Sequence, residues 1–167
     1  EYDKALSMID PVKEKLRAFG EKVTKEDEIV FRHIIAKIYF GAQQYRESLR
    51  QLNLVLNDNE NNLRQDIYSF SKLFNLVIHY ELGNYDLLDY LIKSTERFFN
   101  KRSKALKLGY EFEAAFVGYF KKLSKALRQG ERASHIFKEM KEDLALLLMN
   151  RNEKVALEYF DYLTWVE

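Results

Sequence analysis

The chain has 167 residues, of which 47% are hydrophobic and 32% are charged, and its formal net charge is +1. This composition supplies enough apolar material for a buried core and excludes a disordered chain. The sequence contains no cysteine, which excludes disulfides, thiolate metal sites and a cysteine nucleophile. One proline and six glycines are too few for the frequent turns of a β-sandwich or barrel. Because the chain is also rich in leucine, we expect an all-α protein.

The first residues of the chain and its longest apolar runs indicate where in the cell the protein is located. No apolar run approaches the roughly 18 residues of a membrane-spanning helix, and the first residues lack a signal-peptide pattern. We therefore expect a cytoplasmic protein that makes no contact with a membrane. Residue 1 is Glu rather than Met, so we also expect a C-terminal fragment of a longer protein, cut just before a helix.

Apolar residues at helical spacing predict eight helices. In the first, over about 2–19, either Asp10 caps a new helix or Pro11 kinks a single one. An apolar stripe that continues across the break favours the single kinked helix. The other seven are expected at about 24–41, 45–56, 63–82, 85–99, 105–128, 131–149 and 153–166.

Polar residues and glycines mark where these helices begin and end. We expect Thr24 to cap the second helix, and Gly83 to take the left-handed position that often ends one. The polar run at 57–62 predicts a loop, and 101–104 predicts a basic linker. The helix over 63–82 carries two apolar stripes, so we expect it to be buried on more than one side.

Short turns between neighbouring helices predict antiparallel hairpins, and the pattern recurs along the chain. The segment from Tyr39 to Tyr45 aligns with the segment from His79 to Tyr85. Such a repeat is typical of solenoids, which have periods of about 20–50 residues and in which each hairpin buries its apolar face against the next.

Over residues 2–100 these hairpins resemble the tetratricopeptide repeat (TPR) family. Ala36 and Tyr39 match the small and aromatic positions of its first helix, and Gly83 and Tyr85 match its turn. The match is divergent, because Leu88 stands where the family has a small residue and because the period exceeds about 34 residues.

The resemblance implies a right-handed α-solenoid of antiparallel helix hairpins. We expect one domain over 1–167, with TPR-like hairpins over 2–100 and further hairpins over 101–167 that end in a C-terminal cap. Small residues would allow close approach of the helices, and the tyrosines would fill the gaps between hairpins.

The resemblance also implies a non-enzymatic protein-interaction or scaffold module. Residues at or near the family's ligand-facing positions are His33, Lys37, Tyr80 and Glu81, and we expect them to contact the partner. This partner would be another protein or the missing N-terminal part of the same chain. The family's carboxylate clamp does not carry over, because two of its positions are apolar here.

Three features of this expected interaction module can each be interpreted in two ways. His33 and His79 lie on mostly apolar helices, where histidine more often packs in the core. The apolar row from Phe70 to Tyr80 is either covered or an open groove, and we expect it to be covered. The outer face of 2–19 is expected to pack on preceding repeats or on a second copy, which would form a homodimer.

Nucleic-acid binding is the alternative function, although nucleic acid is the less favoured partner. Residues 97–132 hold ten basic and three acidic side chains. The residues that would contact phosphates are Lys121, Lys122, Lys125 and Arg128. The aromatic residues of this segment keep core spacing, however, so we expect them to be buried. These cations would then form a solvated face or pair with carboxylates.

The sequence carries no strong sign of catalysis or metal binding. Glu131, His135 and Glu139 share one helix face, but no second helix offers further ligands at a matching spacing. Motifs of phosphate loops, zinc proteases and serine hydrolases are missing. We therefore expect no metal, no cofactor and no enzyme activity.

Overall fold

The computed structural model describes residues 2–58, 63–106, 110–150 and 152–167, and these residues form helices and no strand. The expected all-α class is therefore confirmed for the described residues. The chain divides into two compact units, Glu1–Leu82 (unit 1) and Gly83–Glu167 (unit 2), which are described separately. The single domain and the solenoid arrangement stay predictions.

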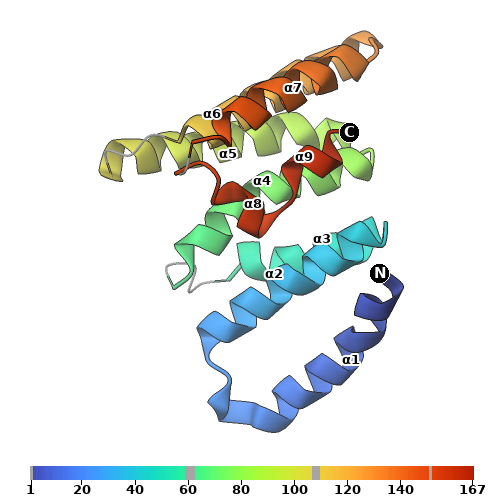
Figure 1. Ribbon diagram of the computed structural model, residues 1–167, viewed down its shortest axis with the longest axis vertical. Coiled ribbons are helices and arrows are strands. Elements are labelled where there is room, and N and C mark those ends of the chain that lie inside the picture. The colour runs from blue at the N-terminus through green and yellow to red at the C-terminus, as the bar shows by residue number, and fades with distance from the viewer. Residues whose placement is uncertain (1, 59–62, 107–109, 151) are drawn as a thin grey trace. The chain divides into compact units, whose positions relative to one another are not determined.

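Unit 1 contains α1 (Tyr2–Phe19), a 3-10 turn η1 (Gly20–Lys22), α2 (Lys25–Gly41), α3 (Tyr45–Leu56) and α4 (Gln65–Glu81) (Figure 1). α1 packs on α2, α2 packs on α3, and α4 packs on both α2 and α3. α1 is one helix with Pro11 inside it, as the continuous apolar stripe favoured. Its first residue packs on the end of α2, where a Cβ added at Gly41 would collide with the Tyr2 ring.

The start of α2 is fixed by a reciprocal cap, as expected. The Thr24 hydroxyl accepts a hydrogen bond from the Asp27 backbone N–H at 3.1 Å, and the Asp27 carboxylate accepts one from the Thr24 backbone N–H at 3.2 Å. This arrangement satisfies two backbone donors that the helix itself cannot satisfy. The hydrogen bonds from Thr24 also lower the pKa of Asp27.

α2 and α3 form a close antiparallel hairpin across a short turn. Ala36 and Ser48 are both fully buried, and the Ser48 hydroxyl donates a hydrogen bond to the Ala36 carbonyl at 2.8 Å. Small side chains at these positions let the two helices approach closely, as predicted. Beside the turn, the Tyr45 ring packs on Phe40 with ring centroids 5.1 Å apart.

The turns after α2 and after α4 share one backbone feature at equivalent positions of the proposed repeat. Gly83 has φ 69°, which confirms the left-handed conformation expected there. Gln43 occupies the equivalent position of the earlier turn and has φ 58°, although it is not glycine. The sequence alignment of the two segments therefore corresponds to a shared local conformation, and one of the two turns carries a less suitable residue for it.

α4 is buried on more than one side, as its two apolar stripes predicted. Eleven of its side chains are buried. In the row from Phe70 to Tyr80, the apolar members Phe70, Leu73 and Val77 are buried and Tyr80 is half-buried. This burial is what the covered alternative predicts.

Unit 2 contains α5 (Tyr85–Leu106), α6 (Glu111–Gln129), α7 (Ser134–Leu147) and the one-turn helices α8 (Ala156–Tyr159) and α9 (Tyr162–Trp165). α6 packs on both α5 and α7, and α9 contacts α7 (Figure 1). A stripe of phenylalanines on α6 forms the core, and the end of the chain packs on it. Tyr162 lies 4.8 Å from Phe116 and Trp165 lies 5.7 Å from Phe120, measured between ring centroids.

Two sequence predictions in unit 2 are wrong. The basic linker at 101–104 is helical and belongs to α5, because its lysines and arginine, like the alanine and leucine that follow it, are good helix formers. The single helix over 153–166 is instead the two short helices α8 and α9, separated where Phe160 adopts an extended conformation with φ −160° and ψ 143°.

Some predictions fall partly outside the described residues. Of the loop at 57–62, only 57–58 are described. Residues 107–109 and 151 also lie outside them. The helix expected over 105–128 begins later than predicted, because residues 105–106 belong to α5 and α6 begins at Glu111.

Replacing Gln43 by glycine should stabilise the protein. A left-handed conformation costs an L-residue about 1–2 kcal/mol, whereas glycine loses about 0.5–1 kcal/mol through the extra freedom of its unfolded chain. We expect a net gain of about 0.5–1 kcal/mol for Gln43→Gly, measured as a higher urea midpoint. Gln44→Gly is the matched control, because Gln44 has an ordinary φ of −88°. A gain from the control that equals the gain from Gln43→Gly would contradict the interpretation.

Candidate functional site

A groove with a volume of about 730 Å³ lies along α1, η1, α2 and α3 in unit 1. Its wall contains apolar side chains from all three α-helices and from the segment before α2: Leu16, Val23, Phe31, Ile35 and Leu54. Cationic side chains from the same three helices lie among them: Lys13, Arg17, Arg32 and Arg50. Glu28 is the acidic side chain in this lining. The groove therefore combines an apolar surface with a surplus of positive charge.

The groove is open to water along part of its wall. Leu54 is 44% exposed, and Arg17 and Arg50 are also exposed. Ile35, by contrast, is buried and belongs to the core of unit 1. An apolar surface that stays in contact with water beside cations is a typical feature of a binding site rather than of a closed core.

The four cations differ in how they are paired. Arg32 pairs with Glu28 and Arg50 pairs with Glu47, each on its own helix. Lys13 Nζ lies 3.9 Å from a carboxylate oxygen of Asp10, so this ion pair is a loose one. Arg17 forms no ion pair with any residue that the structure describes.

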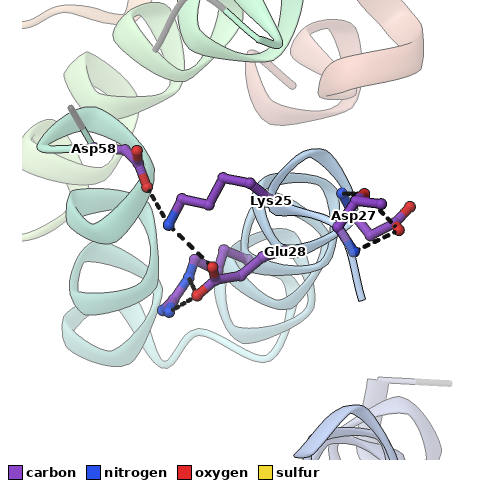
Figure 2. A network of polar contacts seen from close by, with 6 residues as sticks. Lys25, Asp27, Glu28 and Asp58 are labelled. Atoms are coloured by element: carbon purple, nitrogen blue, oxygen red, sulfur yellow. Dashed lines mark hydrogen bonds and ion pairs between the residues drawn. The ribbon is translucent and has the colours of Figure 1, made fainter. Parts of the chain in front are cut away.

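A network of ion pairs holds the groove's acidic residue in place (Figure 2). Lys25 Nζ lies 2.8 Å from Asp58, which follows α3, and 3.0 Å from Glu28. Asp58 and then Glu28 raise the pKa of Lys25, and Arg32 is the main cause of the lowered pKa of Glu28. Because Glu28 has a cation on either side, it does little to offset the remaining positive charge of the groove.

The four residues predicted to bind a partner lie elsewhere, and none of them lines this groove. His33 is buried, and its Nδ1 lies 3.0 Å from the Ser71 hydroxyl, so it has the packing environment that was the alternative interpretation. Lys37, Tyr80 and Glu81 are half-buried. Burial, followed by the charge of Glu81, raises the pKa of Tyr45 beside them.

The four residues of the nucleic-acid alternative are all exposed on α6. Three of them pair with carboxylates of unit 2: Lys121 with Glu96, Lys122 with Glu139, and Arg128 with Asp89. The fourth, Lys125, makes no ion pair with a described residue. The aromatic side chains Phe112, Phe116, Tyr119 and Phe120 are buried, as expected, whereas Tyr110, also expected to be buried, is half-buried. All four cations are therefore solvated, as the sequence favoured, and three of them also pair with carboxylates.

Neither a metal site nor a membrane span is found where the chain is described. Glu131, His135 and Glu139 are exposed, and Glu139 is paired with Lys122. The expectation that the three share one helix face is wrong, because α7 begins at Ser134 and Glu131 precedes it. Within the described ranges, no group of three histidine, cysteine or acidic side chains could hold a metal ion. None of the helices among these residues is long and apolar enough to cross a membrane.

Sequence reasoning missed the groove cations because they come from three separate helices. A partial signal existed in α1, where Lys13 and Arg17 lie one helical turn apart and flank Leu16 on one helix face. Nothing in the sequence indicated that Arg32 and Arg50 would line the same surface. Their approach depends on how α1 packs on the α2–α3 hairpin.

A second site that the sequence did not indicate is a buried carboxyl group in unit 2. Glu113, on α6, is 7% exposed. Burial raises its pKa to about 7, and the nearby charge of Glu153 adds to the rise, while its own backbone N–H and Arg102 act in the opposite direction. The neighbouring Tyr162 hydroxyl is buried and has no hydrogen-bond partner among the described residues. Burial and the charge of Glu113 raise the pKa of Tyr162 well above its usual value.

Glu113 should make the stability of the protein depend on pH. Its pKa is about 7 in the folded chain and 4.5 as the ordinary value, so the unfolded chain loses this proton first. The contribution of Glu113 to folding stability therefore falls as pH rises from about 4.5 to 7, by about 2–3 kcal/mol, and stays constant above that range. Glu113→Gln removes this loss. The free energy of unfolding of the variant, relative to that of the natural chain, should therefore be higher at pH 8 than at pH 5.

Urea unfolding at the two pH values measures this difference. Glu111→Gln is the control, because Glu111 is exposed on the same turn of α6. A constant difference between Glu113→Gln and the natural chain across the range would show that Glu113 does not titrate there.

Comparisons with protein-family models, curated proteins and solved structures find no match for this sequence. The resemblance to TPR repeats therefore stays a prediction. A function for this chain has to be argued from its own geometry and charge.

Proposed function

We propose that unit 1 is a non-enzymatic docking module whose groove binds an acidic amphipathic segment of another protein. The observation that supports this proposal is the open groove itself, in which an apolar wall is bordered by four cations and a single paired carboxylate. A helical segment with one apolar face and one acidic face is complementary to both features.

The apolar wall would supply binding free energy. Leu54 is exposed, and Leu16, Val23 and Phe31 are half-buried, so each still has surface that a partner can remove from water. Burial of apolar surface contributes roughly 25 cal/mol per Å². Side chains at every third or fourth position of a bound helix would lie along this wall.

The cations would select an acidic partner. Arg17 has no ion pair with a described residue, so a partner carboxylate would not have to displace one. Arg50 and its partner Glu47 have side chains that are 64% and 41% exposed, and exposed pairs of this kind contribute little stability. Arginine can bind a carboxylate through two parallel hydrogen bonds, and such contacts speed and orient association.

Two earlier predictions about partners remain separate from this groove. Lys37, Tyr80 and Glu81 stay predicted contacts on another part of unit 1. The outer face of α1 stays a predicted contact for preceding repeats or a second copy, and Met8 and Phe19 of α1 are more than half exposed.

A labelled synthetic peptide tests the groove. The peptide has about 15 residues, enough for four helical turns, with leucines on one helix face and glutamates on the other. We expect Arg17→Glu with Arg50→Glu to weaken its binding at least about tenfold in fluorescence anisotropy, because the bound carboxylates would face like charges. Added salt should also weaken binding to the natural chain.

The matched control is Lys15→Glu with Arg46→Glu. It changes the net charge equally on the same two helices, at exposed residues outside the groove. An equal loss in both variants, or equal binding of a peptide with lysines in place of glutamates, would contradict the proposal. A dimer in sedimentation that disappears only in the groove variant would instead identify a second copy as the occupant and would also overturn it.

A further inference from the structure

We propose that a small pocket between α5 and α6 in unit 2 binds a primary alkylammonium group, with the Glu113 carboxylate as its counter-ion. This inference is independent of the groove in unit 1. It depends on which atoms line the pocket, how deeply they are buried and which charges surround them.

The pocket has a volume of about 190 Å³, and its most deeply buried lining residues are Phe99, Glu113 and Val117. The buried part of the lining therefore comprises one residue with a carboxyl group and two with apolar side chains. In the liquid a water molecule occupies about 30 Å³, so the pocket has room for an alkyl chain of a few carbons and its ammonium group.

The wall on the α6 side is built from small residues. Ala114 and Gly118 lie one turn apart, and a Cβ added at Gly118 would meet no atom within 4 Å. The space above this part of the helix is therefore open. Ser103 and Tyr110 also line the pocket. The Tyr110 hydroxyl accepts a hydrogen bond from Arg102 Nε at 3.3 Å, and a hydroxyl oxygen has a second lone pair with which it could accept one from an ammonium group.

The Glu113 carboxylate has no counter-ion within the described part of the chain. The other charged residues of the pocket, Glu96 and Lys121, pair with each other. Glu153 and Arg102 lie near enough to affect Glu113, but they carry opposite charges, and neither forms an ion pair with it. Burial of an unpaired carboxylate is unfavourable, and the group avoids this cost either by taking up a proton or by contact with a cation such as the proposed ammonium group.

This lining suits an alkylammonium group better than a divalent metal ion. A divalent metal ion needs several oxygen ligands, and no group of three suitable side chains is present among the described residues. An alkylammonium group instead needs one carboxylate, a few acceptors and an apolar surface for its stem. This chemistry is found both in a free small amine and in the lysine side chain of a protein.

Titration with n-butylammonium, followed by amide NMR shifts, tests the proposal on the whole chain. Butanol has nearly the same shape without the charge, and it should bind at least about tenfold more weakly. Glu113→Gln should lose binding at least about tenfold, and Glu111→Gln should stay within about twofold of the natural chain. Equal binding of butanol, or unchanged binding by Glu113→Gln, would overturn the proposal.

Gly118→Leu provides a second test that leaves every charge in place. The new side chain fills the open space above α6, and leucine is a better helix former than glycine, so the fold should persist in circular dichroism. Loss of butylammonium binding supports the pocket as the site, whereas retained binding would refute it.

A third titration uses Nα-acetyl-lysine methylamide to identify the source of the group. Binding at least as tight as that of butylammonium would assign the site to a lysine side chain. Weaker binding would assign it to a free amine.

Discussion

The close contact between α2 and α3 is the constraint on which the rest of unit 1 depends. Ala36 and Ser48 are small enough for the two helices to approach, and the Ser48 hydroxyl bonds to the Ala36 carbonyl where the surfaces meet. This hairpin presents one side to α4 and another to α1. Phe31 and Arg32 of α2 and Leu54 of α3 consequently line one surface, and the groove exists because α1 extends that surface.

The two candidate sites use charge in opposite ways. The groove of unit 1 keeps cations in water beside exposed apolar side chains, so its charges are accessible and easily screened. The pocket of unit 2 holds one carboxyl group away from water, where a single charge has a much larger effect. A long complementary segment suits the first arrangement, and one small cation suits the second.

Local signals were sufficient for much of the fold. The cap formed by Thr24 and Asp27 and the left-handed Gly83 follow from side chains within a few residues. Prediction failed where distant packing decided the conformation: the final helix is interrupted at Phe160, and the Tyr162 ring that follows it is buried against α6. The candidate sites were missed for the same reason. The groove joins residues from three helices, and the environment of Glu113 depends on Glu153, which lies far along the chain, beyond α7.

Pro11 leaves a gap in the backbone hydrogen bonding of α1. Proline has no backbone N–H, so the carbonyl of Ser7 lacks the helical hydrogen bond that another residue would donate, and both residues are exposed. The half before this break is anchored where Tyr2 covers Gly41, and the half after it carries Lys13, Leu16 and Arg17. Bending at Pro11 would therefore move one wall of the groove while its anchor stays in place. The width of the opening could adapt in this way to bound segments with side chains of different bulk.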